Sequence, residues 1–262
     1  QVGQALRAAA WPRGTTLIAL DRRALDITDA PAVRTAFALW RPDAVINTAA
    51  YTDVDQAEQE LDAAFAINRD GAGVRASACA ACDAVLLQLS TDYVFDGHKP
   101  TAWQPDDPAA PLGAYGRSKA AGDTAVRAAL DRHVIVRTAW LHGIQGKNFV
   151  RTMLRAGEQK SHLKVVSDQV GGPTSADDLA QALIAIAQQV TAAQGRFGTY
   201  HFCGVPYVSW YEFAEAIFAR AEKTWGRRPH VAPITSEQWP TAAPRPKNSV
   251  LDCQTLARDY GV

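Results

Sequence analysis

Short apolar runs alternate with longer amphipathic stretches along the first two-thirds of the chain. The apolar runs have the length and β-branched content of buried strands, and the amphipathic stretches have the spacing of helices. The predicted strands are residues 15–20, 44–47, 84–90, 134–138 and 199–203. The predicted helices are residues 31–40, with Asp29 as N-cap, 56–67, 70–81, 114–130, 177–190 and 210–225. Strands that alternate with helices predict an α/β fold with a doubly wound parallel sheet, covered by helices on both faces.

The last third of the chain has a different pattern, because prolines interrupt it repeatedly and loops separate its few regular elements. We interpret this part as a smaller C-terminal lobe that completes a cleft. The predicted sheet domain comprises residues 1–143, with 176–203 returning to it. The predicted smaller lobe comprises residues 144–175 and 204–262.

Composition restricts the classes of partner. The chain has 27 basic and 27 acidic residues and 47% apolar residues, which predicts a sizeable core and no nucleic-acid or anionic-membrane partner. No apolar run approaches the ~20 residues of a membrane span. The four cysteines are sparse and irregularly spaced, as is typical of reduced thiols, so we expect a cytoplasmic protein.

Polar residues follow four of the predicted strands. In open parallel sheets, ligands bind beyond the carboxyl ends of the strands, so four such clusters predict one edge of a binding cleft. The clusters are Asp21-Arg22-Arg23, Asn47-Thr48-Ala49-Ala50, Ser90-Thr91-Asp92-Tyr93 and Thr138-Ala139-Trp140.

The first two clusters have the chemistry of a dinucleotide site. Asp21 can accept a hydrogen bond from an adenosine ribose, whereas Arg22 and Arg23 can hold a 2′-phosphate. Ala49 and Ala50 would let a flat cofactor approach the backbone. Each cluster also has a plainer explanation, a solvated turn for the first and ordinary strand-to-helix packing for the second.

The strongest chemical signal is the pair Tyr115 and Lys119, which lie one helical turn apart on one face. An ammonium beside a phenol lowers the phenol's pKa, and such a tyrosine can give a proton to a carbonyl oxygen. Thr91 could polarise the same carbonyl, and Asp92 could accept from a substrate hydroxyl. The alternatives are an exposed helix pair and two turn-capping side chains.

Other candidates carry less weight. Cys79 and Cys82 form a single CxxC without a second pair, so we expect no metal site there. Trp140 follows a predicted strand, where it can stack on a ligand or belong to the core.

Several longer blocks together are specific. The chain resembles the dTDP-4-dehydrorhamnose reductase family of the extended short-chain dehydrogenase/reductase superfamily over essentially its whole length. The blocks are RPDAVINTAAYTDVDQAE (41–58), STDYVFDG (90–97), YGRSK (115–119), RTAWLHG (137–143), KNFVRTMLR (147–155), SDQVGGPTSADDLA (167–180) and RPKNSVLD (245–252).

The resemblance implies a Rossmann-type dinucleotide domain, residues 1–143 with 176–203, and a sugar-nucleotide lobe. It implies hydride transfer from NADPH, or less readily NADH, to the C4 ketone of dTDP-4-dehydro-L-rhamnose. Tyr115 would be the general acid, Lys119 would lower its pKa and hold the nicotinamide ribose, and Thr91 would polarise the ketone. The implied cofactor contacts are Gly3, Asp21, Asp26, Ile27, Thr48, Ala49, Ala50, Tyr115 and Lys119. The implied substrate contacts are Thr91, Asp92, Trp140, Arg245 and Asn248.

One departure from the family stands out. The family opens with a strand and a glycine-rich loop, roughly GxxGxxG, of which this chain has only Gln1-Val2-Gly3. That loop presents backbone N–H groups to the cofactor pyrophosphate. We therefore expect the natural chain to begin earlier.

Two other functions stay open at this point. One is a non-catalytic NADP-binding subunit, since the regulatory subunit of methionine adenosyltransferase resembles the same family. The other is a nucleotide-sugar epimerase or dehydratase, although a dehydratase commonly has an acidic pair where this chain has Asp92-Tyr93. The sequence leaves open a homodimer, the choice between NADPH and NADH, and a role for Mg²⁺.

Overall fold

Four parallel strands form the central sheet of the computed structural model, which describes residues 1–262. Their order is β1 (Ala44–Asn47), β2 (Val85–Thr91), β3 (His133–Thr138) and β8 (Gly198–His201). β2 lies inside the sheet, where its backbone pairs with β1 and β3. The predicted parallel α/β sheet is therefore confirmed.

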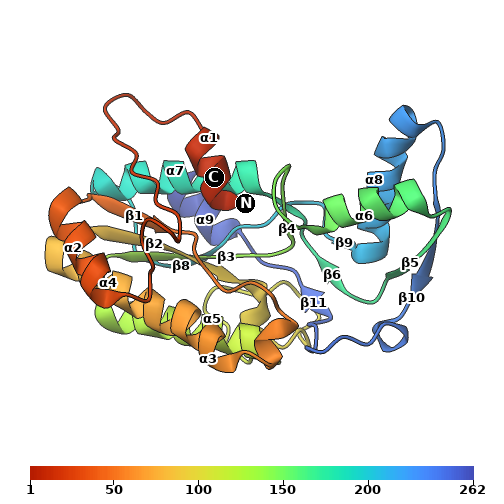
Figure 1. Cartoon of the computed structure of the whole chain (residues 1–262), viewed down its shortest axis with the longest axis horizontal. Coiled ribbons are helices and arrows are strands. Elements are labelled where there is room, and N and C mark those ends of the chain that lie inside the picture. Colours follow the sequence, from red (N-terminus) through yellow and green to blue (C-terminus); the bar gives the residue numbers. More distant parts are fainter.

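Helices cover both faces of this sheet, and β2 shows why (Figure 1). Successive side chains of a strand point to opposite faces. Val85 and Leu87 pack with one set of helices, whereas Leu86 packs with the other set. The first set is α1 (Val2–Ala8), α7 (Ala176–Thr191) and α9 (Gln254–Tyr260). The second set is α2 (Ala30–Trp40), α4 (Gly71–Cys82) and α5 (Ala114–Ala129).

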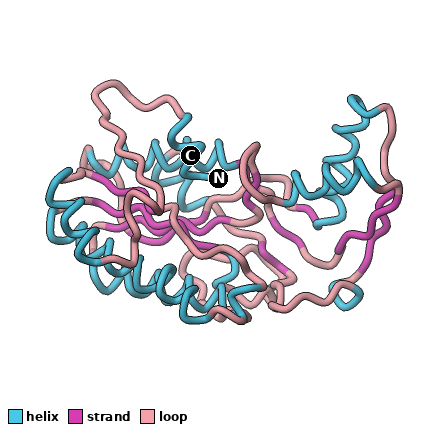
Figure 2. Tube along the Cα trace, in the orientation of Figure 1, coloured by secondary structure: helices cyan, strands magenta, loops and turns pink.

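The smaller lobe lies beside the carboxyl ends of the strands (Figure 2). Phe218 and Val165 belong to its core, which lies between helices and a two-stranded parallel sheet. Its main elements are α6 (Phe149–Gln159), α8 (Trp210–Trp225), β5 (His162–Val166) and β10 (His230–Ile234). Shorter elements are β4 (Leu141–His142), β6 (Val170–Gly171), β7 (Thr174–Ser175), β9 (Val208–Ser209), η4 (Ser236–Gln238) and β11 (Asn248–Ser249).

The helix at the end of the chain belongs by packing to the sheet layer. Leu256 and Tyr260 of α9 are buried with α7 and the sheet, although α9 falls within the range 204–262 that the sequence assigned to the smaller lobe. The domain boundaries stay a prediction, and this packing argues for moving α9 to the sheet domain.

Two predicted elements differ from the structure. Residues 15–20 form no strand; Leu17, Ile18 and Leu20 are 42%, 44% and 40% exposed. The prediction is wrong because a strand needs a neighbour for its backbone hydrogen bonds, and no other segment pairs with these residues. Asp21-Arg22-Arg23 therefore follows a loop instead of a strand.

The predicted helix 56–67 is divided into shorter turns. They are η1 (Gln56–Glu58), α3 (Leu61–Phe65) and η2 (Ala66–Asp70), of which η2 has the wider π-helical winding. The helices predicted at 31–40, 70–81, 114–130, 177–190 and 210–225 are all present.

Candidate active site

Thr91 and Asp92 stand at the carboxyl end of β2. Thr91 caps the short helix η3 (Asp92–Val94): its hydroxyl oxygen accepts from the N–H of Tyr93 at 3.2 Å. The same hydroxyl donates to Asp92 Oδ1 at 2.9 Å. Both side chains are buried, and Asp92 Oδ2 has no hydrogen-bond partner. Burial raises the pKa of Asp92 to about 6, although the nearby Ser249 hydroxyl and the hydrogen bond from Thr91 oppose the shift.

The start of α5 is fixed by contacts from outside the helix. Its N-cap, Gly113, has no side chain, and Glu58 Oε1 of η1 instead accepts the N–H of Ala114 at 2.6 Å. A Cβ on Gly116 would lie 2.2 Å from the carbonyl oxygen of Tyr93, so only glycine permits this close packing on η3. These contacts set Tyr115 beside the end of β2.

The phenol of Tyr115 lies next to Thr91. Its ring packs edge-on against Tyr93, with 5.5 Å between ring centroids. Burial raises the pKa of Tyr115 well above its usual range; the neighbouring Thr91 hydroxyl opposes this shift, and the Asp92 carboxylate adds to it. The lowered phenol pKa that we expected from Lys119 is therefore not observed, because burial dominates.

Lys119 lies one turn further along α5 and points at the sheet. Its ammonium donates to the carbonyl oxygen of Leu89 at 2.7 Å, and the residue is 3% exposed. Burial lowers the pKa of Lys119 to about 8; Asp123 opposes this shift and Arg75 adds to it. The structure thus brings Thr91, Asp92 and Tyr115 into contact, with Lys119 anchored to the backbone of β2 just before Thr91.

The end of β1 offers a surface of small residues. Ala49 is exposed and Ala50 is partly exposed. Gly3 packs against Thr48 so closely that a Cβ on it would lie 2.9 Å from Thr48 Oγ1. A flat dinucleotide fits such a surface, because no bulky side chain keeps it from the backbone.

The side chains at the remaining predicted cofactor positions contact residues near them rather than the end of β1. Asp21 Oδ1 accepts from the N–H groups of Arg23 and Ala24, and Asp26 Oδ1 accepts from the N–H and hydroxyl of Thr28. The side chain of Ile27 packs against Gly71. No hydrogen bond joins these three residues to Thr48 or Tyr115, so the structure does not gather them into one cluster.

The predicted substrate positions Trp140 and Asn248 have different environments. Trp140 adopts the left-handed backbone conformation, with φ of 49°, and stacks on Trp210 of α8 with 3.4 Å between centroids. Asn248, by contrast, uses its amide to bind the carbonyl oxygens of Lys99 and Thr101, which gives it a structural role in holding that loop.

Arg245 is linked indirectly to Thr91 and Tyr115. Its guanidinium donates to Asp55 Oδ2 at 2.8 Å and lies 5.9 Å from the ring centroid of Tyr93. Because Tyr93 packs on Tyr115, a chain of contacts leads from Asp55 through Arg245 to the phenol.

Sequence reasoning missed some residues that shape this site. Asn68, 2% exposed in the π-helical turn, binds the backbone N–H and carbonyl of Tyr51 and the hydroxyl of Ser118. Asp55 and Glu58 hold neighbouring segments in place. Nothing in single-sequence periodicity marks such residues; only the block 41–58 as a whole carried a signal.

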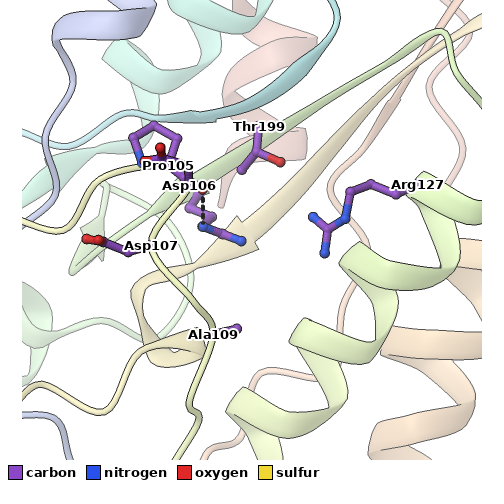
Figure 3. A pocket seen from close by; sticks show the side chains of 7 residues that line it. Pro105, Asp106, Asp107, Ala109, Arg127 and Thr199 are labelled. Atoms are coloured by element: carbon purple, nitrogen blue, oxygen red, sulfur yellow. Dashed lines mark hydrogen bonds between the residues drawn. The ribbon is translucent and has the colours of Figure 1, made fainter.

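A separate cavity of about 390 Å³ opens between the loop 105–109 and the side of α5 (Figure 3). Arg127 points toward it from α5, and Arg137, which also lines it, donates to the carbonyl oxygen of Pro105 at 3.0 Å. Thr91, Tyr115 and Lys119 are absent from its lining, so the cavity is distinct from the candidate active site.

Comparison with known families identifies the class of this site. The model of the RmlD substrate binding domain matches residues 1–262. The chain belongs to the RmlD substrate binding domain family. The resemblance found in the sequence predicts Tyr115, Lys119 and Thr91 as the functional residues of this family.

Named relatives agree with this assignment. The chain is 42% identical to the dTDP-4-dehydrorhamnose reductase of Aggregatibacter actinomycetemcomitans over 94% of this chain and 85% of the relative. It is 39% identical to that of Sinorhizobium fredii over 100% and 89%. A solved dTDP-4-dehydrorhamnose reductase of Bacillus anthracis, in complex with NADP, is 37% identical to this chain and has a TM-score of 0.91. The match covers 98% of this chain and 89% of the solved one. No helix of the protein is long and apolar enough to cross a membrane.

Proposed function

We propose that this RmlD-family chain is an NADPH-dependent oxidoreductase that reduces the C4 ketone of dTDP-4-dehydro-L-rhamnose to give dTDP-L-rhamnose. The single observation that carries the proposal is the placement of Thr91 and Tyr115 around Tyr93 at the end of β2: the Thr91 hydroxyl accepts from the Tyr93 N–H, and the Tyr115 ring packs on the Tyr93 ring. The similarity to reductases of this name over nearly the whole chain supports the choice of substrate.

The residues at the strand ends fit a dinucleotide. Gly3, Thr48, Ala49 and Ala50 would hold it against the end of β1, and NADPH bound there would supply the hydride. Asp21, Asp26 and Ile27 are proposed cofactor contacts from the family resemblance alone, because each makes only local contacts in this structure.

Tyr115 acts as the general acid in this proposal. Its raised pKa keeps the phenol protonated at neutral pH, so a proton is available for the ketone oxygen. Thr91 donates a hydrogen bond to the same oxygen once its hydroxyl turns away from Asp92 Oδ1, to which it donates in this structure. Lys119 donates to the Leu89 carbonyl oxygen and, with a pKa of about 8, is mostly charged at neutral pH, and in this proposal it holds the nicotinamide ribose.

The smaller lobe completes the substrate site. Trp140 and Arg245, at the junction of the lobes, are the side chains that we propose to face the sugar nucleotide. Asp92 is proposed to accept from a sugar hydroxyl, because its Oδ2 is without a partner. We also propose that the enzyme acts in the cytoplasm, which its four free cysteines favour.

The test is a reductase assay on the full chain. We expect NADPH absorbance to fall only when dTDP-4-dehydro-L-rhamnose is present, with dTDP-L-rhamnose as the product identified by mass and chromatography. Reactions without the keto sugar, and with NADH in place of NADPH, are the controls. A folded protein that binds NADPH yet gives no turnover would overturn the proposal and favour a binding subunit.

A further inference from the structure

Two cysteines that are 50 positions apart in the chain lie side by side. The sulfur atoms of Cys203 and Cys253 are 3.7 Å apart, both residues are partly exposed, and both are free thiols. Cys203 follows β8, and Cys253 directly precedes α9. The reductase chemistry proposed above uses neither of them.

The surroundings make the two thiols unequal. The backbone N–H of Cys203 donates to the sulfur of Cys253 at 3.3 Å, which stabilises a thiolate on Cys253. Hydrogen bonding from the Cys203 thiol lowers the pKa of Cys253, whereas the same contact, together with burial, raises the pKa of Cys203. The geometry therefore provides one nucleophilic sulfur and one neighbouring thiol that can resolve an oxidised partner.

We propose that Cys203 and Cys253 form a peroxide-sensitive dithiol that closes to an intramolecular disulfide. The Cys253 thiolate attacks one oxygen of hydrogen peroxide, the O–O bond breaks, and a sulfenic acid and hydroxide result. The hydroxide takes the proton of the Cys203 thiol to give water. The Cys203 thiolate then attacks the sulfenic sulfur and expels hydroxide, which is protonated to a second water. Two thiols are oxidised, and one peroxide is reduced to two waters.

Closure of this bond would act on the substrate side of the molecule. A disulfide needs about 2.05 Å between its sulfurs, so the side chains of Cys203 and Cys253 must move toward each other from the present 3.7 Å. Cys203 packs in one cluster with Trp140 and Leu251, and a Cβ on Gly172 would lie 3.0 Å from its sulfur. Movement there displaces the neighbours of Trp140, so oxidation should lower turnover of the keto sugar several-fold and reversibly.

Mass spectrometry gives the deciding measurement and does not depend on any reductase activity. The protein is treated with hydrogen peroxide, alkylated and cut with trypsin. Cys203 and Cys253 then lie in separate peptides, 197–220 and 248–258, whereas Cys79 and Cys82 share the peptide 76–117. We expect loss of two hydrogen atoms from the intact chain and a cross-link between 197–220 and 248–258 that dithiothreitol removes.

Variants complete the test. Cys253→Ser should abolish the cross-link, and Cys82→Ser, in a residue on α4 that bonds only its own helix backbone, should leave it unchanged. Both peptides recovered singly and alkylated after peroxide treatment, or a disulfide confined to 76–117, would overturn the proposal. If the cross-link forms but wild-type turnover stays constant, the proposed coupling to the substrate pocket is wrong.

Discussion

At the scale of single residues, the site depends on how burial sets protonation at the end of β2. Burial raises the pKa of Tyr115 and of Asp92, so both groups favour their protonated forms. The Thr91 hydroxyl donates to Asp92 and neighbours Tyr115. Lys119 is shifted the other way, toward its neutral form. The three titrating groups therefore favour a low total charge around the place where a ketone would bind, which suits a step that creates a transient phenolate.

Removing the phenol tests the proton donor. Tyr115→Phe keeps the ring that packs on Tyr93 but deletes the hydroxyl, so we expect kcat to fall on the order of 10²-fold or more while the fold persists. Steady-state NADPH oxidation measures the effect, and circular dichroism checks the fold. Near-normal kcat in this variant would mean that another group donates the proton.

Asp92 should leave a signature in the pH dependence of stability. Its pKa is raised from 3.8 to about 6 on folding, so the native state holds more protons than the unfolded state between those values. The contribution of Asp92 to the free energy of unfolding is therefore present below pH 4 and lost as pH rises through 6.

Asp92→Asn removes that titration. We expect the stability of the wild type relative to this variant to fall between pH 4 and pH 6, as measured by urea unfolding at each pH. A difference that stays constant across the same range would show that the Asp92 carboxyl is not shifted.

At the scale of elements, the position of Tyr115, the proposed acid, depends on where α5 begins. A glycine N-cap satisfies none of the orphan N–H groups at a helix start, and Glu58 supplies the missing acceptor from η1. One side chain thus joins the end of the segment 41–58 to the helix that carries Tyr115 and Lys119.

Glu58→Ala should loosen that start. We expect a loss of about 1 kcal/mol in the free energy of unfolding, the usual effect of a lost cap, together with a lower kcat because Tyr115 is held less firmly. Glu58→Gln is the matched control, since its amide oxygen can still accept from Ala114 although the weaker contact with Arg117 is lost. Equal stability of the alanine and glutamine variants would contradict the capping role.

Elements with strong local patterns were predictable, and those that depend on a distant partner were not. β2 has an apolar run and α8 has amphipathic spacing, and each pattern predicts its element from a short stretch of sequence. Residues 15–20 have the same local character as β2, but a strand also requires a neighbour, which no local pattern reveals. The same limit applies to the candidate site: Tyr115 and Lys119 share a helix, so local spacing predicts them as a pair, whereas Asn68 and the Glu58 cap act through contacts with other segments.

At the scale of the whole molecule, the two lobes are joined near the site by charged and aromatic contacts. Trp140 stacks on Trp210 of α8. Asp55 accepts hydrogen bonds from Ala243 and Arg245, and these two bonds form what we call the Asp55 clasp. Such a junction can fix the distance between cofactor and substrate, because one partner of each contact comes from each lobe.

The Asp55 clasp yields the last prediction. Its carboxylate accepts from the N–H of Ala243 at 3.0 Å and from Arg245 at 2.8 Å. Although burial raises the pKa of Asp55, these two contacts outweigh it and hold the pKa below its usual value. The stabilisation is therefore present above pH 4 and is lost as pH falls further. Asp55→Ala should raise KM for the sugar nucleotide several-fold and leave the affinity for NADPH nearly unchanged.

Asp55→Asn separates the two contacts of the clasp. It retains an oxygen for Ala243 but loses the charge that holds Arg245, so its KM should fall between those of the wild type and Asp55→Ala. Titration calorimetry with NADPH, beside steady-state kinetics with the keto sugar, distinguishes a substrate-side effect from general damage. A matching loss of NADPH affinity would place the role of Asp55 in the stability of the whole fold, because a clasp that acts only on 243–245 has no contact through which to weaken a dinucleotide at the end of β1.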